Sequence, residues 1–308
     1  ILSDSLSELR YNIKDDNIVS YYDFFIDKIN PKPDLIIRFG KKPVSKNLNQ
    51  FLKRLNSRTI LLTKYNGYND DAKPIYVSSF KSIKAIKSND NKWLKKIIDL
   101  EEETEKIINK YHHKKYFFEG NIIYNCLKSI DSNDNLFIGN SMCVRNLDKF
   151  CPNINKKINL YSNRGASGID GLIATAIGTA HVNKKTKTTL IIGDVSFFYD
   201  SNSLLIAKQQ KININIIVIN NNGGQIFNTL PYAKKDIKDF KDYWITPIDL
   251  SIKKVCDLYD ANFTSFDSIE QINNQLNSIF KTPGINIIEI KCDKKNNFRI
   301  EKEIKQQF

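Results

Sequence analysis

Short apolar runs that alternate with stretches of helical periodicity constrain the fold of this chain more than any other feature of its sequence. The apolar runs have the length and β-branched character of buried strands and cover Asp34–Arg38, Thr59–Thr63, Asn135–Ile138, Thr188–Ile192, Ile214–Ile219 and Ile285–Ile290. The helical segments between them are Val19–Ile29, Lys46–Leu55, Lys92–Tyr111, Gly120–Ser129, Gly168–His181, Ser201–Gln210 and Ser268–Phe280. This alternation predicts an α/β fold with doubly wound parallel sheets, whose crossover helices cover both faces.

The length of 308 residues is sufficient for two domains with separate cores. The polar helical segment that ends near Tyr111 precedes a second series of strands and helices, so we place the boundary near residue 115. This division gives a first domain in residues 1–115, which is short for a domain, and a second in residues 116–308. Because the only methionine is Met142, we expect that a part of the natural protein upstream of Ile1 is missing and that the first domain is truncated at its start.

The net charge of +13 raises the question of a nucleic-acid partner. Most of the 47 basic residues are scattered lysines, and no basic stripe is interleaved with aromatic side chains, so we expect no nucleic-acid binding. The longest apolar runs, such as Ile214–Ile219, fall far short of the roughly 20 residues of a membrane helix, so we expect no membrane span. The five cysteines contain no CxxC pair, which disfavours disulfides and zinc and favours the reducing cytoplasm.

Polar residues with oxygen ligands follow two of the predicted strands. Gly193-Asp194 follows one apolar run, and Asn221 lies in the segment 220–224 after Ile214–Ile219. Because the carboxyl ends of neighbouring parallel strands meet at one edge of a sheet, we expect these residues to converge. Carboxylate, amide and backbone carbonyl oxygens suit Mg²⁺, which takes further ligands from phosphates. The sequence therefore predicts a magnesium site and a diphosphate cofactor.

This pattern resembles the thiamine-diphosphate signature, in which Gly-Asp begins and Asn-Asn ends a segment of about this length. Further segments carry the resemblance: RFG at 38–40, PVSK at 43–46, GNS at 139–141, SNRGASGIDG at 162–171 and NGGQIF at 222–227. Together they resemble the MenD family of menaquinone-pathway synthases from residue 1 to about residue 295. The resemblance implies the middle domain of that family, from partway in, followed by its whole diphosphate-binding domain.

The resemblance implies that the chain binds thiamine diphosphate with Mg²⁺, or with Mn²⁺ in its place. Asp194 and Asn221 would bind the metal through their side chains, and Gly223 through its carbonyl oxygen. Ile169 falls where the family places the apolar side chain that holds the cofactor in its bent shape. The other implied cofactor-binding positions are Ser141, Gly168, Gly193, Val195, Ser196, Gly224, Gln225 and Ile226.

The implied substrates are 2-oxoglutarate and isochorismate. Decarboxylation of the first and addition of the succinyl-semialdehyde carbanion to the second would give 2-succinyl-5-enolpyruvyl-6-hydroxy-3-cyclohexene-1-carboxylate. Arg145 and Arg164 match positions that contact these acidic substrates, and with Ile169 they are the implied catalytic residues; arginine pairs bidentately with carboxylates. The other implied substrate-binding positions are Ser141, Ile226, Phe227 and Lys46. The family also implies a homo-oligomer, either a dimer or a tetramer.

In this family a glutamate from a separate aminopyrimidine-binding domain activates the cofactor, and no segment of this chain reads as that domain. We therefore expect the chain to carry only the metal and diphosphate half of the site and to be inactive by itself. Two alternatives stay open: another thiamine-diphosphate carboligase or decarboxylase, such as an acetolactate-synthase-like enzyme, and a non-catalytic binding or assembly module. A Rossmann dinucleotide site is disfavoured because Gly165, Gly168 and Gly171 lack the GxGxxG spacing.

Overall fold

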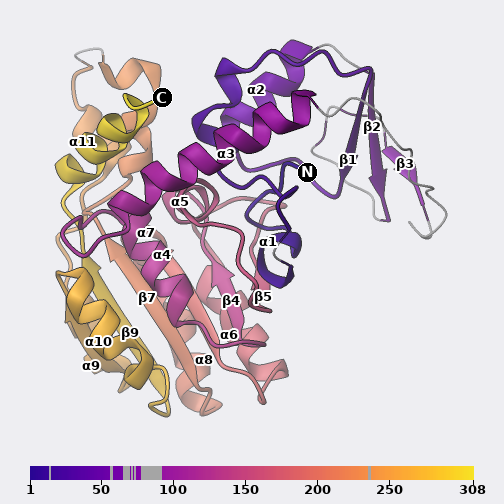
Figure 1. Ribbon diagram of the computed structural model, residues 1–308. Coiled ribbons are helices and arrows are strands. Elements are labelled where there is room, and N and C mark those ends of the chain that lie inside the picture. Colours follow the sequence, from indigo (N-terminus) through magenta and orange to yellow (C-terminus); the bar gives the residue numbers. More distant parts are fainter. Residues whose placement is uncertain are drawn as a thin grey trace.

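The computed structural model of the chain contains two parallel β-sheets with helices packed around them (Figure 1). It describes residues 1–13, 15–55, 58–64, 70, 72, 74–77, 92–234 and 237–308. The smaller sheet has the order β1-β2-β3, formed by Leu35–Phe39, Arg58–Thr63 and Pro74–Tyr76, and both of its pairings are parallel. The predicted α/β class with parallel sheets is thus confirmed.

The larger sheet has six strands in the order β5-β4-β6-β7-β9-β8, and every pairing is parallel. The strands are β4 (Asn135–Ile138), β5 (Asn159–Tyr161), β6 (Thr188–Gly193), β7 (Ile214–Asn220), β8 (Asn262–Phe266) and β9 (Ile285–Lys291). After β5 the chain crosses to the other side of β4 to form β6. The crevice between the carboxyl ends of β4 and β6 is therefore a topological switch point, where α/β proteins commonly bind ligands.

Helices cover both faces of the larger sheet, because alternate strand residues point to opposite sides. The helices in this part are α4 (Glu119–Ser129), α5 (Met142–Phe150), α6 (Leu172–Val182), α7 (Asp194–Asp200), α8 (Leu204–Gln209), α9 (Ile252–Tyr259), α10 (Ile269–Ile279) and α11 (Lys294–Lys305). Ile191 packs with α4, α5 and α10 on one face. Its neighbours Leu190 and Ile192 pack with α6, α8 and α9 on the other.

The first 111 residues contain α1 (Leu9–Asn12), α2 (Lys46–Leu55) and α3 (Lys92–Tyr111). The predicted helix over Val19–Ile29 is wrong, since this segment forms only two short 3₁₀ turns, η1 (Tyr22–Phe24) and η2 (Ile26–Lys28). Its first backbone groups bond elsewhere: Val19 pairs with Ile1 and Ser3, and the N–H groups of Ser20 and Tyr21 donate to the Glu101 carboxylate. Those bonds replace the helical ladder.

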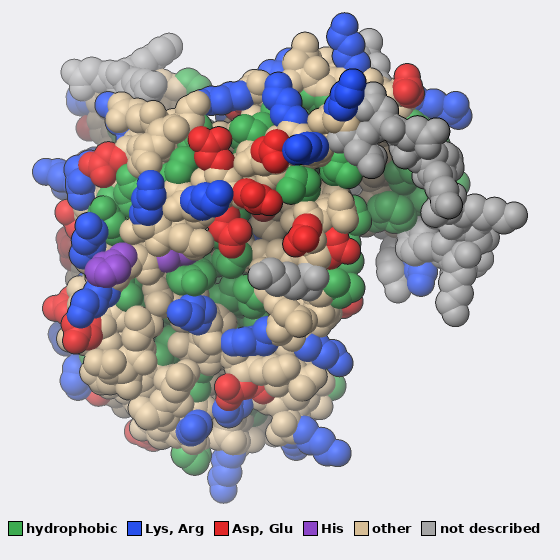
Figure 2. Space-filling view, viewed as in Figure 1, with side chains coloured by type: hydrophobic (Ala, Val, Ile, Leu, Met, Phe, Trp, Pro, Cys, Tyr) green, Lys and Arg blue, Asp and Glu red, His purple; other side chains and the backbone are tan. Residues whose placement is uncertain are grey.

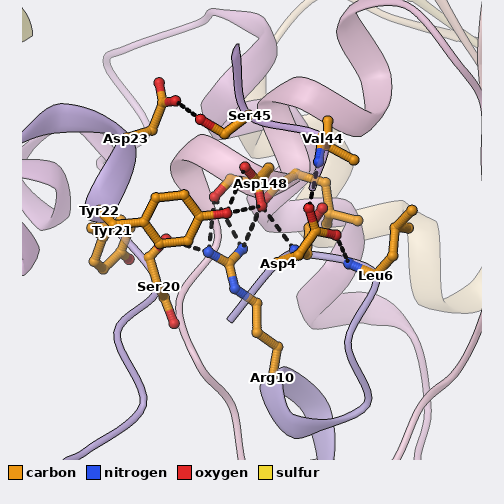
Figure 3. Close-up of polar contacts among 12 residues, drawn as sticks. Asp4, Leu6, Arg10, Ser20, Tyr21, Tyr22, Asp23, Val44, Ser45 and Asp148 are labelled. Carbon is orange, nitrogen blue, oxygen red and sulfur yellow. Dashed lines mark hydrogen bonds and ion pairs between the residues drawn. The ribbon is translucent and has the colours of Figure 1, made fainter. Parts of the chain in front are cut away.

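A buried polar network joins the N-terminal residues to α5 (Figure 3). The guanidinium of Arg10 donates to the carbonyl oxygen of Asp148 at 3.0 Å and lies 3.8 Å from its carboxylate. The same carboxylate accepts from the backbone N–H of Ser5 at 2.8 Å and from the Tyr22 hydroxyl at 3.1 Å. All four side chains are at most 3% exposed, so this network fixes one side of α5.

An apolar cluster also joins residues that precede position 115 to residues that follow it. It contains Tyr21, Phe24, Ile107, Ile108, Tyr111, Phe118, Phe150, Ile300 and Ile304, and we call it the bridging cluster. The ring of Phe150 lies 5.6 Å from that of Phe24 and 5.3 Å from that of Phe118, both edge-on. Residues from both predicted domains thus share one core here, and the boundary near residue 115 stays a prediction.

Charged side chains of both signs are interspersed on the face shown in Figure 2, where blue Lys and Arg atoms lie among red Asp and Glu atoms.

None of the helices in the described ranges combines the length and the hydropathy that crossing a membrane requires.

Candidate functional site

A pocket of about 430 Å³ lies at the carboxyl ends of β4, β6 and β7, at the switch point of the larger sheet. Most of the residues predicted from the sequence line it: Ser141, Arg145, Arg164, Ile169, Gly193, Asp194, Val195, Ser196, Asn221, Gly223, Gly224, Gln225, Ile226 and Phe227. The topology explains the convergence, because Gly193 pairs with Ile219 and so places the ends of β6 and β7 side by side.

Two predicted residues do not line this pocket. The carbonyl oxygen of Gly168 accepts a hydrogen bond at 2.8 Å from the side chain of Asn140, which does line the pocket. Lys46 is exposed at the first residue of α2 and is not among the pocket residues. Its contact with a substrate stays a prediction.

Asp194 connects the ends of β6 and β7. Its Oδ1 atom accepts from the Val195 N–H at 2.9 Å, and its Oδ2 atom accepts from the Gly223 N–H at 2.8 Å. Burial, which leaves the residue 2% exposed, raises the pKa of Asp194 to about 6. Each carboxylate oxygen retains a second lone pair for another partner.

The glycine at 223 is required by its surroundings. Its φ angle of +114° lies in a region that side chains disfavour, and an added Cβ would meet the carbonyl oxygen of Ile245 at 2.3 Å. This close approach allows its N–H to reach Asp194. Its carbonyl oxygen accepts from the Gln225 N–H at 2.8 Å, so one lone pair stays available.

The donor set of the loop fits a hard divalent cation. The Oδ1 atom of Asn221 is buried and has no hydrogen-bond partner among the described residues, while its Nδ2 atom donates to Glu119 at 2.7 Å. An orphaned amide oxygen beside the Asp194 carboxylate is the kind of ligand that Mg²⁺ or Mn²⁺ takes. Within the described ranges no cluster of three or more His, Cys, Asp or Glu side chains offers an alternative metal site.

Two arginines give the pocket a positive wall. Arg145 donates to the carbonyl oxygen of Ser141 at 2.7 Å, and Arg164 donates to the Asn140 side chain at 2.8 Å. In the part of the chain that the structure describes, neither guanidinium forms an ion pair. Burial lowers the pKa of both groups, and their mutual repulsion lowers that of Arg145 further. Both groups keep free N–H donors that suit a carboxylate.

Ser141 adopts a backbone conformation that non-glycine residues rarely take. Its φ and ψ angles are 62° and −129°, and it is the residue that precedes the first turn of α5. Strain of this kind is concentrated at ligand-binding sites, where the surrounding structure enforces it. The turn places Ser141 at the pocket wall together with Arg145, one helical turn further on.

The pocket also contains residues that are not among the predicted site positions, although Asn140 and Ser167 lie in the segments that carry the resemblance. These additional residues are Glu119, Asn140, Met142, Cys143, Ser167, Ile219, Tyr243, Trp244 and Thr246. The Trp244 ring packs edge-on against that of Phe227, with centroids 5.4 Å apart. Glu119 begins α4 and Trp244 belongs to a single π-helical turn at Lys241–Ile245, so neither lies in a motif that local spacing could have shown.

The comparisons with known proteins agree with this geometry. Residues 144–290 match the family described as thiamine pyrophosphate enzyme, C-terminal TPP binding domain. Curated proteins named 2-succinyl-5-enolpyruvyl-6-hydroxy-3-cyclohexene-1-carboxylate synthase also match the chain. That of Bacillus cytotoxicus is 32% identical over 320 residues, covering 99% of this chain and 54% of the relative.

The protein of the same name from Oceanobacillus iheyensis is 33% identical over 317 residues, covering 96% of this chain and 54% of the relative. The protein of this name from Staphylococcus epidermidis is 35% identical over 284 residues, covering 87% of this chain and 49% of the relative. The chain thus spans about half the length of the curated relatives that it matches. It is therefore a homologue of the MenD synthases, and it contains the C-terminal TPP-binding domain of thiamine pyrophosphate enzymes.

Proposed function

We propose that this chain is the metal- and diphosphate-binding part of a thiamine-diphosphate-dependent synthase of menaquinone biosynthesis. One observation carries the proposal: the buried Asp194 carboxylate and the Asn221 oxygen lie in the same pocket as Arg145 and Arg164, and within the described residues that oxygen has no hydrogen-bond partner and neither arginine has an ion-pair partner. The first pair suits a divalent cation bound to a diphosphate. The second pair suits a substrate that carries several carboxylates.

In this proposal Asp194, Asn221 and the carbonyl oxygen of Gly223 hold Mg²⁺ or Mn²⁺, which binds the diphosphate. Bound thiamine diphosphate supplies the electron sink that decarboxylation of a 2-oxo acid requires. The residues that contact it are those of the pocket wall around Ile169 and the loop from Gly224 to Ile226. Ile169 presents an apolar side chain to the pocket and excludes water there.

The proposed reaction is decarboxylation of 2-oxoglutarate followed by addition of the four-carbon product to isochorismate. Arg145 and Arg164 hold the carboxylates of these substrates and so orient them, which lowers the entropic part of the barrier. Ile226 and Phe227 give the pocket an apolar surface beside the arginines, which suits the carbon ring of isochorismate. The product is 2-succinyl-5-enolpyruvyl-6-hydroxy-3-cyclohexene-1-carboxylate, the compound in the names of the relatives.

We propose that the site is completed from outside these 308 residues, since the relatives are about twice as long. The acid–base glutamate and a further positive group for a substrate carboxylate would come from there, and the isolated chain would bind the cofactor without turning over. The proposed working form is a cytoplasmic homo-oligomer. Exposed apolar side chains on α7 and α8, such as Tyr199 and Ile206, support an association through these helices.

Titration of thiamine diphosphate into the chain, followed by calorimetry, tests the proposed function. We expect binding with Mg²⁺ or Mn²⁺ and none in EDTA, and we expect Asp194→Ala to abolish the metal-dependent part while circular dichroism stays unchanged. Metal-dependent binding that survives in Asp194→Ala would refute the proposed site. Absence of binding in the unsubstituted chain would favour a non-catalytic module.

An acetolactate-synthase-like activity is the second candidate, because it would use the same metal ligands. The two candidate activities are distinguished by assaying CO₂ release by the natural enzyme from its source cells. The two arginines favour a dicarboxylate, so we expect 2-oxoglutarate to be used with isochorismate and pyruvate to be a poor donor. A preference for pyruvate would reverse the choice.

A further inference from the structure

Glu119 is a buried carboxylate that three asparagine side chains surround. It begins α4 and is 5% exposed. Its Oε1 atom accepts from the Nδ2 atoms of Asn221 at 2.7 Å and Asn297 at 2.8 Å, and its Oε2 atom accepts from the Nδ2 atom of Asn146 at 2.8 Å. The donors come from the loop after β7, from α11 and from α5, so three separate elements converge on one side chain.

The orientation of these amides follows from the chemistry of the carboxylate. Both carboxylate oxygens of Glu119 act as acceptors, so each amide presents its nitrogen to them. Asn297 supplies an independent check, because its Oδ1 atom accepts from the backbone N–H of Glu119 at 2.8 Å. That bond fixes the Asn297 amide with its Nδ2 atom toward the carboxylate.

The same rule fixes the orientation of the Asn221 side-chain amide. Because its Nδ2 atom faces Glu119, its Oδ1 atom must face the other way, and this oxygen is buried without a hydrogen-bond partner in the described structure. Asn221 lines the pocket together with Asp194. A reversed amide would set oxygen against oxygen at Glu119 and would turn N–H groups toward the place of a cation.

We propose that Glu119 is a positioning residue that locks the side-chain amide of Asn221 with its oxygen toward the metal site. The inference rests on the proposed function, since it assigns Glu119 a role in the same site. Glu119 acts here through Asn221 and is not itself a metal ligand. Asn146 and Asn297 in turn hold the carboxylate, which extends the support of the site to α5 and α11.

The test measures Mn²⁺ binding in the presence of thiamine diphosphate, with the electron paramagnetic resonance signal of free Mn²⁺ as the readout. Glu119→Ala removes both acceptor oxygens and lets the amide turn, so we expect at least about a tenfold loss of Mn²⁺ affinity, the size typical of residues that support metal ligands. Glu119→Gln removes the charge but can place its amide oxygen at the Oε1 position. We therefore expect it to retain affinity within about threefold.

Glu289→Ala is the matched control. Glu289 is 7% exposed and its Oε1 atom accepts from the Nδ2 atom of Asn220 at 2.7 Å, so this change removes a comparable Asn-to-carboxylate bond from the residue next to Asn221, at the end of β7. It should leave Mn²⁺ affinity within about twofold. Equal losses in Glu119→Ala and Glu289→Ala would show a general effect on the end of β7 and the segment that follows it, and would overturn the proposal.

Two further results separate positioning from other roles. Equal losses in Glu119→Gln and Glu119→Ala would mean that the charge matters, and they would overturn the proposal. In an Asn221→Ala background, Glu119→Ala should cause no further loss, because the residue that it positions is gone. A further tenfold loss would make Glu119 a direct ligand or a source of electrostatic attraction and would equally overturn it.

Failure of the proposed function gives a different result. If the unsubstituted chain shows no Mn²⁺-dependent binding of thiamine diphosphate, the proposed function fails before any variant is compared. If Glu119→Ala does not fold, as judged by circular dichroism, Asn297→Ala at the surface end of the network replaces it. That change frees one side of the carboxylate, and we expect a loss of Mn²⁺ affinity of about threefold; an unchanged affinity would contradict the inference.

Discussion

The backbone at Ser141 is the clearest single-residue strain in the pocket. Its φ angle of 62° is one that glycine adopts without steric cost, whereas a residue with a Cβ atom gives up about 1–3 kcal/mol there. In the described structure the Ser141 hydroxyl makes no hydrogen bond that would offset this cost. We expect Ser141→Gly to raise the free energy of unfolding by about 1 kcal/mol, measured by urea denaturation.

Ser141→Ala is the control for this prediction. It also removes the hydroxyl but keeps the Cβ atom, so it should not raise the free energy of unfolding. If both substitutions stabilised the chain equally, the hydroxyl rather than the backbone angle would be the source of strain. The Ser141→Gly chain should also lose substrate affinity if the hydroxyl contacts a substrate.

At the scale of elements, α5 is held from two sides. Its first turn lies at the pocket, and Asp148 near its end is paired with the fully buried Arg10. Removing one partner of a buried ion pair leaves the other charge without compensation, which costs about 3–5 kcal/mol. We expect Asp148→Asn to lower the free energy of unfolding by that amount, measured by urea denaturation.

The exposed pair of Lys253 and Asp257 on α9 serves as the comparison. Its atoms lie 3.0 Å apart, but both side chains are about 60% exposed, and such pairs contribute little. Asp257→Asn should therefore lower the free energy of unfolding by less than about 0.5 kcal/mol. A loss below about 1 kcal/mol in Asp148→Asn would show that the buried network contributes no more than a surface pair.

Glu101 on α3 should make the stability depend on pH. Burial raises its pKa to about 7, although it accepts bonds from the N–H groups of Ser20 and Tyr21; Arg10 lowers this pKa and Glu105 raises it. The folded chain thus holds a proton that the unfolded chain releases near its ordinary pKa. This contribution to stability is complete at low pH and is lost as the pH rises through about 7.

The variant Glu101→Gln stays neutral in both states and should lack this dependence. The free energy of unfolding of the unsubstituted chain should therefore fall relative to that of Glu101→Gln between about pH 5 and pH 8, by up to about 3 kcal/mol. Urea denaturation at several pH values measures the difference. If the free energies of unfolding of the two chains changed in parallel with pH, a residue other than Glu101 would cause the pH dependence.

Elements with strong periodicity could be predicted from the sequence, and those made by tertiary contacts could not. The helices Lys46–Leu55 and Lys92–Tyr111 have their predicted bounds. The edge strands β5 and β8 were missed because they are short and partly polar. In the site, Asp194 and Asn221 could be found because each follows a predicted strand, but Glu119 reaches the site from α4 through three-dimensional packing alone.

At the scale of the whole molecule, the bridging cluster and the Arg10 network should make the chain unfold as one unit. The cluster contains Ile107 and Ile108 from α3 and Ile300 and Ile304 from α11, so neither part can unfold without exposing apolar surface of the other. The two tryptophans report on the two parts separately, since Trp93 lies on α3 and Trp244 lines the pocket.

The coupling can be measured in the two single-tryptophan variants, Trp93→Phe and Trp244→Phe. We expect the urea midpoints reported by the remaining tryptophan to coincide with those from far-ultraviolet circular dichroism. Because Mg²⁺ and thiamine diphosphate bind only the folded chain, they should raise both midpoints together. A rise reported by Trp244 alone would mean that the part containing α3 unfolds independently and that the buried contacts between the parts do not transmit the free energy of binding.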